Sequence, residues 1–166
     1  GLGGLGHMGV KFAVSFGAEV SVISTSPNKE ADAKKLGATH FIVSTSEADM
    51  KKYNNYFDVI LDAISANHDY TKYLNLLALN GKLMVVGLPT EAPKVQPFSL
   101  VSNRRSVIGS CIGGMKETQE MLDYCTEHNI VSDIEVIPMQ NINEAYTRML
   151  RGDVKYRFVI DLASLK

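Results

Sequence analysis

The feature that most restricts how this chain can fold is a glycine-rich segment, Gly1-Leu2-Gly3-Gly4-Leu5-Gly6. It fits the G-x-G-x-x-G pattern. In that pattern the first glycine allows a tight turn, the second lets a pyrophosphate approach the backbone, and the third permits close packing of a helix on a strand. A helix is expected directly afterwards, from His7 to Gly17, because polar side chains recur there every four residues on an otherwise apolar segment. Its first turn would offer free N–H groups to phosphates, so the pattern predicts a dinucleotide site.

Short apolar strands alternate with helices after this segment. The expected strands are 20–23, 40–43, 57–63, 82–87 and 106–112, and the expected helices are 29–36, 48–53 and 70–79, with a turn at 80–81. This alternation predicts parallel βαβ units with helices on both faces of one sheet, which is the doubly wound α/β or Rossmann fold. The glycine-rich segment normally follows a strand. We therefore expect a sheet that lacks its first strand, in a chain that is the downstream part of a longer protein.

The pattern changes after Gly114, where the sequence predicts a helix with one apolar stripe, a strand at 134–137, an amphipathic helix from Ile142 to Leu150 and a last strand at 156–162. Asn141 and Glu144 resemble a capping box at the start of the second helix. We expect residues 1–114 to form a nucleotide-binding domain and residues 115–166 to form an α+β segment of a second, catalytic domain.

Composition excludes several classes of function. Seventeen Lys and Arg against 18 Asp and Glu leave a formal net charge of −1, so nucleic acid is not expected as a ligand. No apolar stretch is long enough to span a bilayer, and no signal peptide is visible. The only cysteines, Cys111 and Cys125, allow neither a disulfide framework nor a four-cysteine zinc site, and the histidines lack metal-ligand spacing. These features favour a cytoplasmic protein that binds no metal through this chain.

The turn after the second expected strand bears on the choice of cofactor. An acid about 20 residues after the first glycine normally holds the ribose 2′-hydroxyl of NAD, but this position is Ser24 and no acid occurs from 20 to 28. Ser24, Thr25 and Ser26 stand there instead, with Lys29 close behind. Hydroxyls and an ammonium suit a 2′-phosphate, and therefore NADP. The alternative is that these residues serve only as turn formers.

Five further residues have less definite interpretations. His7 stands where the helix begins, and is either a hydrogen-bond donor to a ligand or a solvated helix residue. We expect Cys111 to be a small buried side chain and Cys125 to belong to the core. The pair Arg104-Arg105 is expected to be solvated, near a subunit interface.

Several stretches together resemble the zinc-dependent medium-chain alcohol dehydrogenases, and within them the branch of cinnamyl alcohol and mannitol dehydrogenases. These stretches are the glycine-rich segment with His7, then Val22 to Ser26, Ile112 to Met121 and Asp153 to Asp161. The resemblance covers essentially the whole chain, and the last two stretches are its most specific parts.

The resemblance implies a role for each matching residue. Pyrophosphate would be held by Gly1, Gly3, Gly4, Leu5, Gly6 and Arg157, and the 2′-phosphate of NADP by Ser24, Thr25, Ser26 and Lys29. Along the nicotinamide would lie Val86 and Gly87, and its carboxamide would meet the backbone of Ser110 and Ile112.

The resemblance also implies a function, which is interconversion of primary alcohols and aldehydes with NADP by a zinc enzyme that forms a homodimer through residues 94 to 110. The family's zinc ligands lie before the glycine-rich segment, so this chain alone is expected to be inactive. A non-catalytic dinucleotide-binding module and a zinc-free relative of the quinone reductases remain as alternatives. The upstream reading frame would distinguish them.

Overall fold

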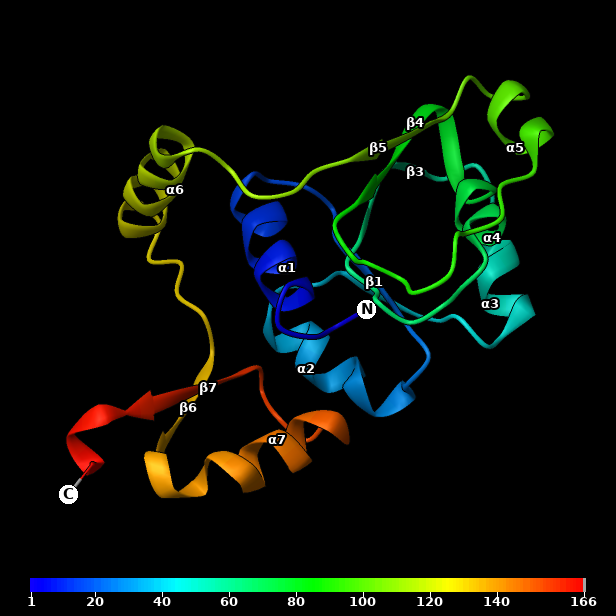
Figure 1. The fold of residues 1–166 in the computed structure, drawn as a ribbon. Coiled ribbons are helices and arrows are strands. Elements are labelled where there is room, and N and C mark those ends of the chain that lie inside the picture. The colour runs from blue at the N-terminus through cyan, green and yellow to red at the C-terminus, as the bar shows by residue number, and fades with distance from the viewer. Residues whose placement is uncertain (166) are drawn as a thin grey trace.

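The computed structural model describes residues 1–165, in which helices alternate with parallel strands (Figure 1). The elements of the first part are α1 (Gly6–Ser15), β1 (Ser21–Ser24), the 3-10 helix η1 (Pro27–Lys29), α2 (Glu30–Lys35), β2 (His40–Val43), α3 (Glu47–Lys52), β3 (Phe57–Asp62), α4 (Tyr70–Leu74), β4 (Leu77–Val85), α5 (Pro97–Val101) and β5 (Ser106–Gly109). Then follow α6 (Met115–Glu127), β6 (Ile134–Pro138), η2 (Met139–Asn141), α7 (Ile142–Leu150), β7 (Arg157–Asp161) and η3 (Leu162–Ser164).

The strands of the first part form two parallel sheets, β1-β2 and β3-β4-β5. The facing edges of β1 and β3 are not paired with each other, and a cleft of 470 Å³ lies between them. Apolar side chains of both strands line it, and Val59 and Leu61 of β3 remain 51% and 42% exposed. This arrangement confirms the doubly wound α/β fold without its first strand. Because no strand within residues 1–165 joins the two halves, the expected single sheet is divided.

Two apolar clusters support these sheets. The first packs α1 and α2 on β1, with the buried residues Leu2, Val10, Val20, Val22, Ala33, Ala38 and Tyr156. The second packs α4 on β4, with Tyr70, Leu74, Leu77 and Leu83. Tyr156 belongs to the cluster of α1 although it lies in the last part of the chain, so burial of apolar surface holds the two ends together.

The expected helix 70–79 is wrong in its second half. It ends at Leu74, and β4 begins at Leu77. The pair Asn80-Gly81 lies inside β4, at an irregularity in its pairing with β3: Phe57 pairs with Leu77, but Val59 pairs with Lys82. Asn80 has a φ of 62° there. Leu77 is 0% exposed in its strand position. Burial of that side chain thus overrides the local helical pattern.

The C-terminal part is a βαβ unit, in which α7 connects the parallel strands β6 and β7 (Figure 1). Arg148 of α7 holds this unit together through bonds of 2.5 and 2.9 Å to the carboxylate of Glu135 in β6. The capping box expected at Asn141 and Glu144 is wrong, because the side chain of Asn141 makes no cap hydrogen bond and η2 leads directly into α7. Within residues 1–165, no helix is long and apolar enough to cross a membrane.

Candidate functional site

The glycine-rich loop packs its first and last glycines against each other. A Cβ atom at Gly6 would overlap the carbonyl oxygen of Gly1, so this close approach requires glycine. A Cβ at Gly3 would meet nothing within 4 Å. The loop therefore uses Gly1 and Gly6 for its own fold, whereas Gly3 borders open space into which a ligand could fit.

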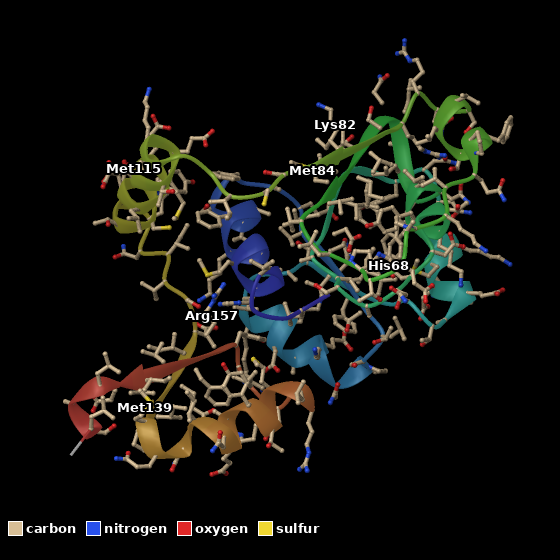
Figure 2. The ribbon with its side chains drawn as sticks, in the orientation of Figure 1. His68, Lys82, Met84, Met115, Met139 and Arg157 are labelled. Carbon is tan, nitrogen blue, oxygen red and sulfur yellow. The ribbon has the colours of Figure 1, made fainter. Side chains whose placement is uncertain are left out.

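Two cationic side chains bind carbonyl oxygens of this loop. Lys29, at the end of η1, donates from Nζ to the carbonyl oxygen of Leu2 at 3.0 Å. Arg157, the first residue of β7, donates to the carbonyl oxygen of Gly4 at 3.3 Å. Figure 2 shows Arg157 at the border between the C-terminal strands and the part of the chain that contains α1 and α2. The fold thus brings both predicted phosphate-binding cations to the glycine-rich loop.

The loop also has two backbone N–H groups that could donate to a ligand. Within residues 1–165, the N–H groups of Gly4 and Leu5 donate to no protein acceptor. They lie at the start of α1, where the helix dipole adds positive potential. Free N–H groups, two cations and an open face at Gly3 fit a pyrophosphate.

The turn after β1 contains a hydrogen bond typical of a turn former, and a cation lies close to it. The hydroxyl of Ser24, which is buried, accepts a hydrogen bond of 3.2 Å from the backbone N–H of Ser26, as a turn former would. Thr25 is exposed, and Lys29 stands close to the glycine-rich loop through its bond to Leu2. No carboxylate belongs to the turn, so nothing in it would repel a 2′-phosphate.

The predicted nicotinamide segment lies where β4 ends. The backbone N–H groups of Val86 and Gly87 donate to the carbonyl oxygen of Asp62, at 2.9 and 3.0 Å. A Cβ at Gly87 would overlap the backbone of Ile64, which explains glycine at this position. The other two predicted positions, Ser110 and Ile112, follow β5. Ser110 donates its N–H to the carbonyl oxygen of Val85 at 3.1 Å, and the side chain of Ile112 is 95% exposed.

Sequence reasoning missed one polar cluster at the end of β3. Asp62 is 5% exposed, and one of its carboxylate oxygens lies 3.0 Å from Nε2 of His68. The other ring nitrogen of His68 lies 2.8 Å from the carbonyl oxygen of Ala66, and both acceptors require a donor. The ring of His68 thus bridges the side chain of Asp62 and the carbonyl oxygen of Ala66. The two residues are six apart in sequence, a spacing that no helix or strand period would have indicated.

His7 has neither of its two expected roles. It is 0% exposed, and its ring nitrogens lie 3.1 Å from the carbonyl oxygen of Gly3 and 3.1 Å from the hydroxyl of Ser132. It is therefore neither solvated nor turned toward a ligand. The sequence could not show this, because Ser132 lies in a distant part of the chain.

Three other expectations are also wrong. Cys111 is exposed, because β5 ends at Gly109 before reaching it, and Cys125 is only half-buried on α6. Arg105 is buried instead of solvated, and its guanidinium donates to the carbonyl oxygens of Leu77 and Ser99, both at 2.8 Å. Burial lowers the pKa of Arg105 from its usual value.

Metal-binding side chains do not gather in the part of the chain that the structure describes. No group of three or more His, Cys, Asp or Glu residues lies close enough together there to hold a metal ion. The described residues thus do not fit a zinc site, which needs at least three protein ligands.

Comparison with known proteins agrees with the geometry. The family model of the zinc-binding dehydrogenases matches residues 4–127. A probable mannitol dehydrogenase of Medicago sativa is 55% identical over 165 residues, and a probable cinnamyl alcohol dehydrogenase of Oryza sativa is 49% identical over 163. These alignments cover 99% and 98% of this chain but only 46% and 45% of the relatives, so the chain spans about half of their length.

Solved structures give the same result. A cinnamyl alcohol dehydrogenase of Sorghum bicolor has a TM-score of 0.97 at 43% identity, over 100% of this chain and 47% of that protein. The cinnamyl alcohol dehydrogenase of Helicobacter pylori, complexed with NADP(H), has a TM-score of 0.87 at 42% identity, over 98% and 46%. From its sequence and its fold, this chain belongs to the zinc-binding dehydrogenase family, beside the mannitol and cinnamyl alcohol dehydrogenases.

Proposed function

We propose that residues 1–114 bind NADP(H) and that residues 115–166 belong to the catalytic domain of an alcohol dehydrogenase. The main support is the glycine-rich loop, where two cations bind carbonyl oxygens and where two backbone N–H groups have no protein acceptor within residues 1–165. Gly1, Gly3, Gly4, Leu5, Gly6 and Arg157 would hold the pyrophosphate. Ser24, Thr25, Ser26 and Lys29 would hold the 2′-phosphate. The related NADP(H) complex from Helicobacter pylori supports the choice of cofactor.

The remaining proposed contacts concern the nicotinamide. Val86 and Gly87 would lie along its ring, and the backbone of Ser110 and Ile112 would meet its carboxamide. When bound, the cofactor supplies hydride exchange with the carbon of the substrate, so that an alcohol and NADP⁺ give an aldehyde, NADPH and a proton. The residues of this chain bind and orient it. Zinc would be held by other parts of the protein, since the described residues offer no ligand set.

We further propose that the whole protein is a cytoplasmic homodimer acting on small alcohols and aldehydes. Support for the dimer comes from β5, which is the outer strand of its sheet and pairs only with β4 within residues 1–165. Its residues are exposed, including Val107 and Ile108 at 39% each, as expected of a strand that pairs with a second copy.

Direct titration tests this proposal. NADPH and NADH are titrated into the protein that carries this chain, with the dissociation constants measured by isothermal titration calorimetry. We expect NADPH to bind at least tenfold more tightly, because a charge-assisted contact to a phosphate contributes about 1.5–3 kcal/mol. Equal affinities would contradict the assignment of NADP, and no binding of either would contradict the dinucleotide site.

A further inference from the structure

The polar stripe of α1, formed by His7, Lys11 and Ser15, contacts the C-terminal part of the chain. Lys11 donates to the carboxylate of Asp133 at 2.6 Å and to the carbonyl oxygen of Val131 at 2.7 Å. One turn earlier, His7 meets Ser132 of the same segment. The helix that begins at the glycine-rich loop is thus bound along one face by residues 131–133, and His7 is the contact nearest to the loop.

The bonds of the His7 ring define its protonation state. The carbonyl oxygen of Gly3 can only accept, so Nδ1 carries the hydrogen at their 3.1 Å contact. The backbone N–H of Asp133 donates to Nε2 at 3.3 Å, so Nε2 carries the lone pair, and the Ser132 hydroxyl also lies 3.1 Å from it. His7 is therefore the neutral tautomer protonated on Nδ1, which joins one donor and one acceptor from two distant segments.

The surroundings of His7 favour this neutral form. Its ring stacks on Tyr156 with centroids 4.5 Å apart, and it is fully buried. The charged groups facing it are the ammonium of Lys11, from its own helix, and the carboxylate of Asp133, from the segment before β6. Burial is the largest influence and lowers the pKa of His7, and Lys11 acts in the same direction. The bond to Gly3 and the charge of Asp133 act against them.

Tyr156, which stacks on His7, and its neighbour Arg157 also contact the glycine-rich loop. The carbonyl oxygen of Tyr156 lies 3.6 Å from where a Cβ of Gly4 would be, and Arg157 binds the carbonyl oxygen of Gly4. The backbone N–H of Tyr156 donates in turn to the carbonyl oxygen of Asp133 at 3.0 Å. His7 thus contacts the glycine-rich loop, the segment before β6 and the segment before β7, and these three also contact one another.

We propose that His7 is a positioning residue of the dinucleotide site. Through Gly3 on one side and Ser132, Asp133 and Tyr156 on the other, it fixes the glycine-rich loop against the C-terminal segments. The N–H groups of Gly4 and Leu5 then remain free for the pyrophosphate. This inference rests on the proposed function. The inference adds that the C-terminal part of the chain holds the glycine-rich loop in position. It does so through His7, which does not touch the ligand.

The test compares three ligands in the protein that carries this chain. NADPH and NADH both have a pyrophosphate, whereas adenosine 2′-monophosphate carries the 2′-phosphate without it. Dissociation constants are measured by calorimetry for the first two and by displacement of NADPH for the third. His7→Leu fills the space without hydrogen bonds. In this variant we expect the dissociation constants of NADPH and NADH to rise by a common factor of about ten. The affinity for adenosine 2′-monophosphate should stay within about twofold of wild type, as expected for a site that keeps its fold.

Two further variants make the test independent of the folding of His7→Leu. Ser132→Ala removes one partner of Nε2. It should raise the dissociation constants of both dinucleotides by the same factor, which should be smaller than in His7→Leu. The matched control is Thr126→Ala, which removes an exposed hydroxyl of α6 that contacts neither His7 nor the loop, and it should bind as wild type does. Unchanged dinucleotide affinities in both His7→Leu and Ser132→Ala would overturn the positioning role, as would an equal loss for all three ligands. Wild type that binds NADPH only as weakly as NADH would instead count against the proposed cofactor.

Discussion

The imidazole ring of His7 lies nearly parallel to the phenol ring of Tyr156, with centroids 4.5 Å apart and planes 17° apart. The two residues come from opposite ends of the chain, and both are buried. Burial, together with the nearby carboxylates of Asp32 and Asp133, raises the pKa of Tyr156 to about 12. Each ring is therefore neutral near pH 7, and the stack joins the start of α1 to the start of β7 without burying a net charge.

The first prediction concerns pH and His7. Because its pKa in the folded chain lies below the ordinary value of 6.5, the unfolded chain binds more protons between these two values. The contribution of His7 to the free energy of unfolding should be constant above pH 6.5, should fall as the pH drops from 6.5 toward the lowered pKa, and should be level again below it. Urea unfolding between pH 5 and 8 measures this. The slope should be lost in His7→Leu and kept in His128→Gln, whose side chain is exposed. A slope that persists in His7→Leu would contradict the assignment.

The second prediction separates two roles of glycine. Gly3→Ala should leave the melting temperature unchanged, because its Cβ meets nothing within 4 Å, but it should greatly weaken NADPH binding by filling the ligand's space. Gly6→Ala should instead destabilise the fold by about 1–3 kcal/mol or more, because its Cβ overlaps the carbonyl oxygen of Gly1. Thermal melts without and with NADPH measure both effects. If Gly3→Ala bound NADPH normally, the pyrophosphate could not lie against that glycine.

The third prediction concerns the choice between NADP and NAD. Ser24→Asp should reverse the preference, since a carboxylate repels the 2′-phosphate and accepts a hydrogen bond from a 2′-hydroxyl. Lys29→Ala should weaken NADPH by about tenfold or more and should barely affect NADH. The measurement is kcat/KM with each cofactor. An equal loss with both cofactors in Lys29→Ala would mean that Lys29 acts only through its hydrogen bond to the carbonyl oxygen of Leu2.

The fourth prediction concerns Arg105, whose buried guanidinium binds the carbonyl oxygens of Leu77 and Ser99 and the side chain of Asn55. Arg105→Met leaves these buried acceptors without a donor and should cost about 3 kcal/mol in the free energy of unfolding. The matched control is Arg104→Asn. Arg104 is exposed with a φ of 48°, which asparagine tolerates, so the control should change stability by less than about 0.5 kcal/mol. Denaturant titration measures the free energy of unfolding of both variants. Equal values would show that the buried hydrogen bonds of Arg105 do not stabilise the fold.

Local sequence determined the secondary structure where one local signal acted alone. The strand expected at 40–43 is β2 with the same bounds, and Gly17 and Gly37 end their helices with φ values of 77° and 99°. Such features depend on neighbouring residues only, since glycine is the residue that adopts positive φ without strain. The G-x-G-x-x-G spacing likewise sufficed to predict a close turn, and the overlap of a Gly6 Cβ with Gly1 confirms it.

Only the tertiary structure decided where side chains with two possible roles lie. The stripe formed by His7, Lys11 and Ser15 has the same period whether it faces water or protein, and it faces residues 124–133. Arg105 follows the exposed Arg104 directly, yet three acceptors from separate elements surround it. The helical pattern through Leu77 gave way to a strand because the sheet buries that side chain completely. In each case the deciding partner is remote in sequence, so burial and hydrogen-bond pairing between distant segments determined the outcome.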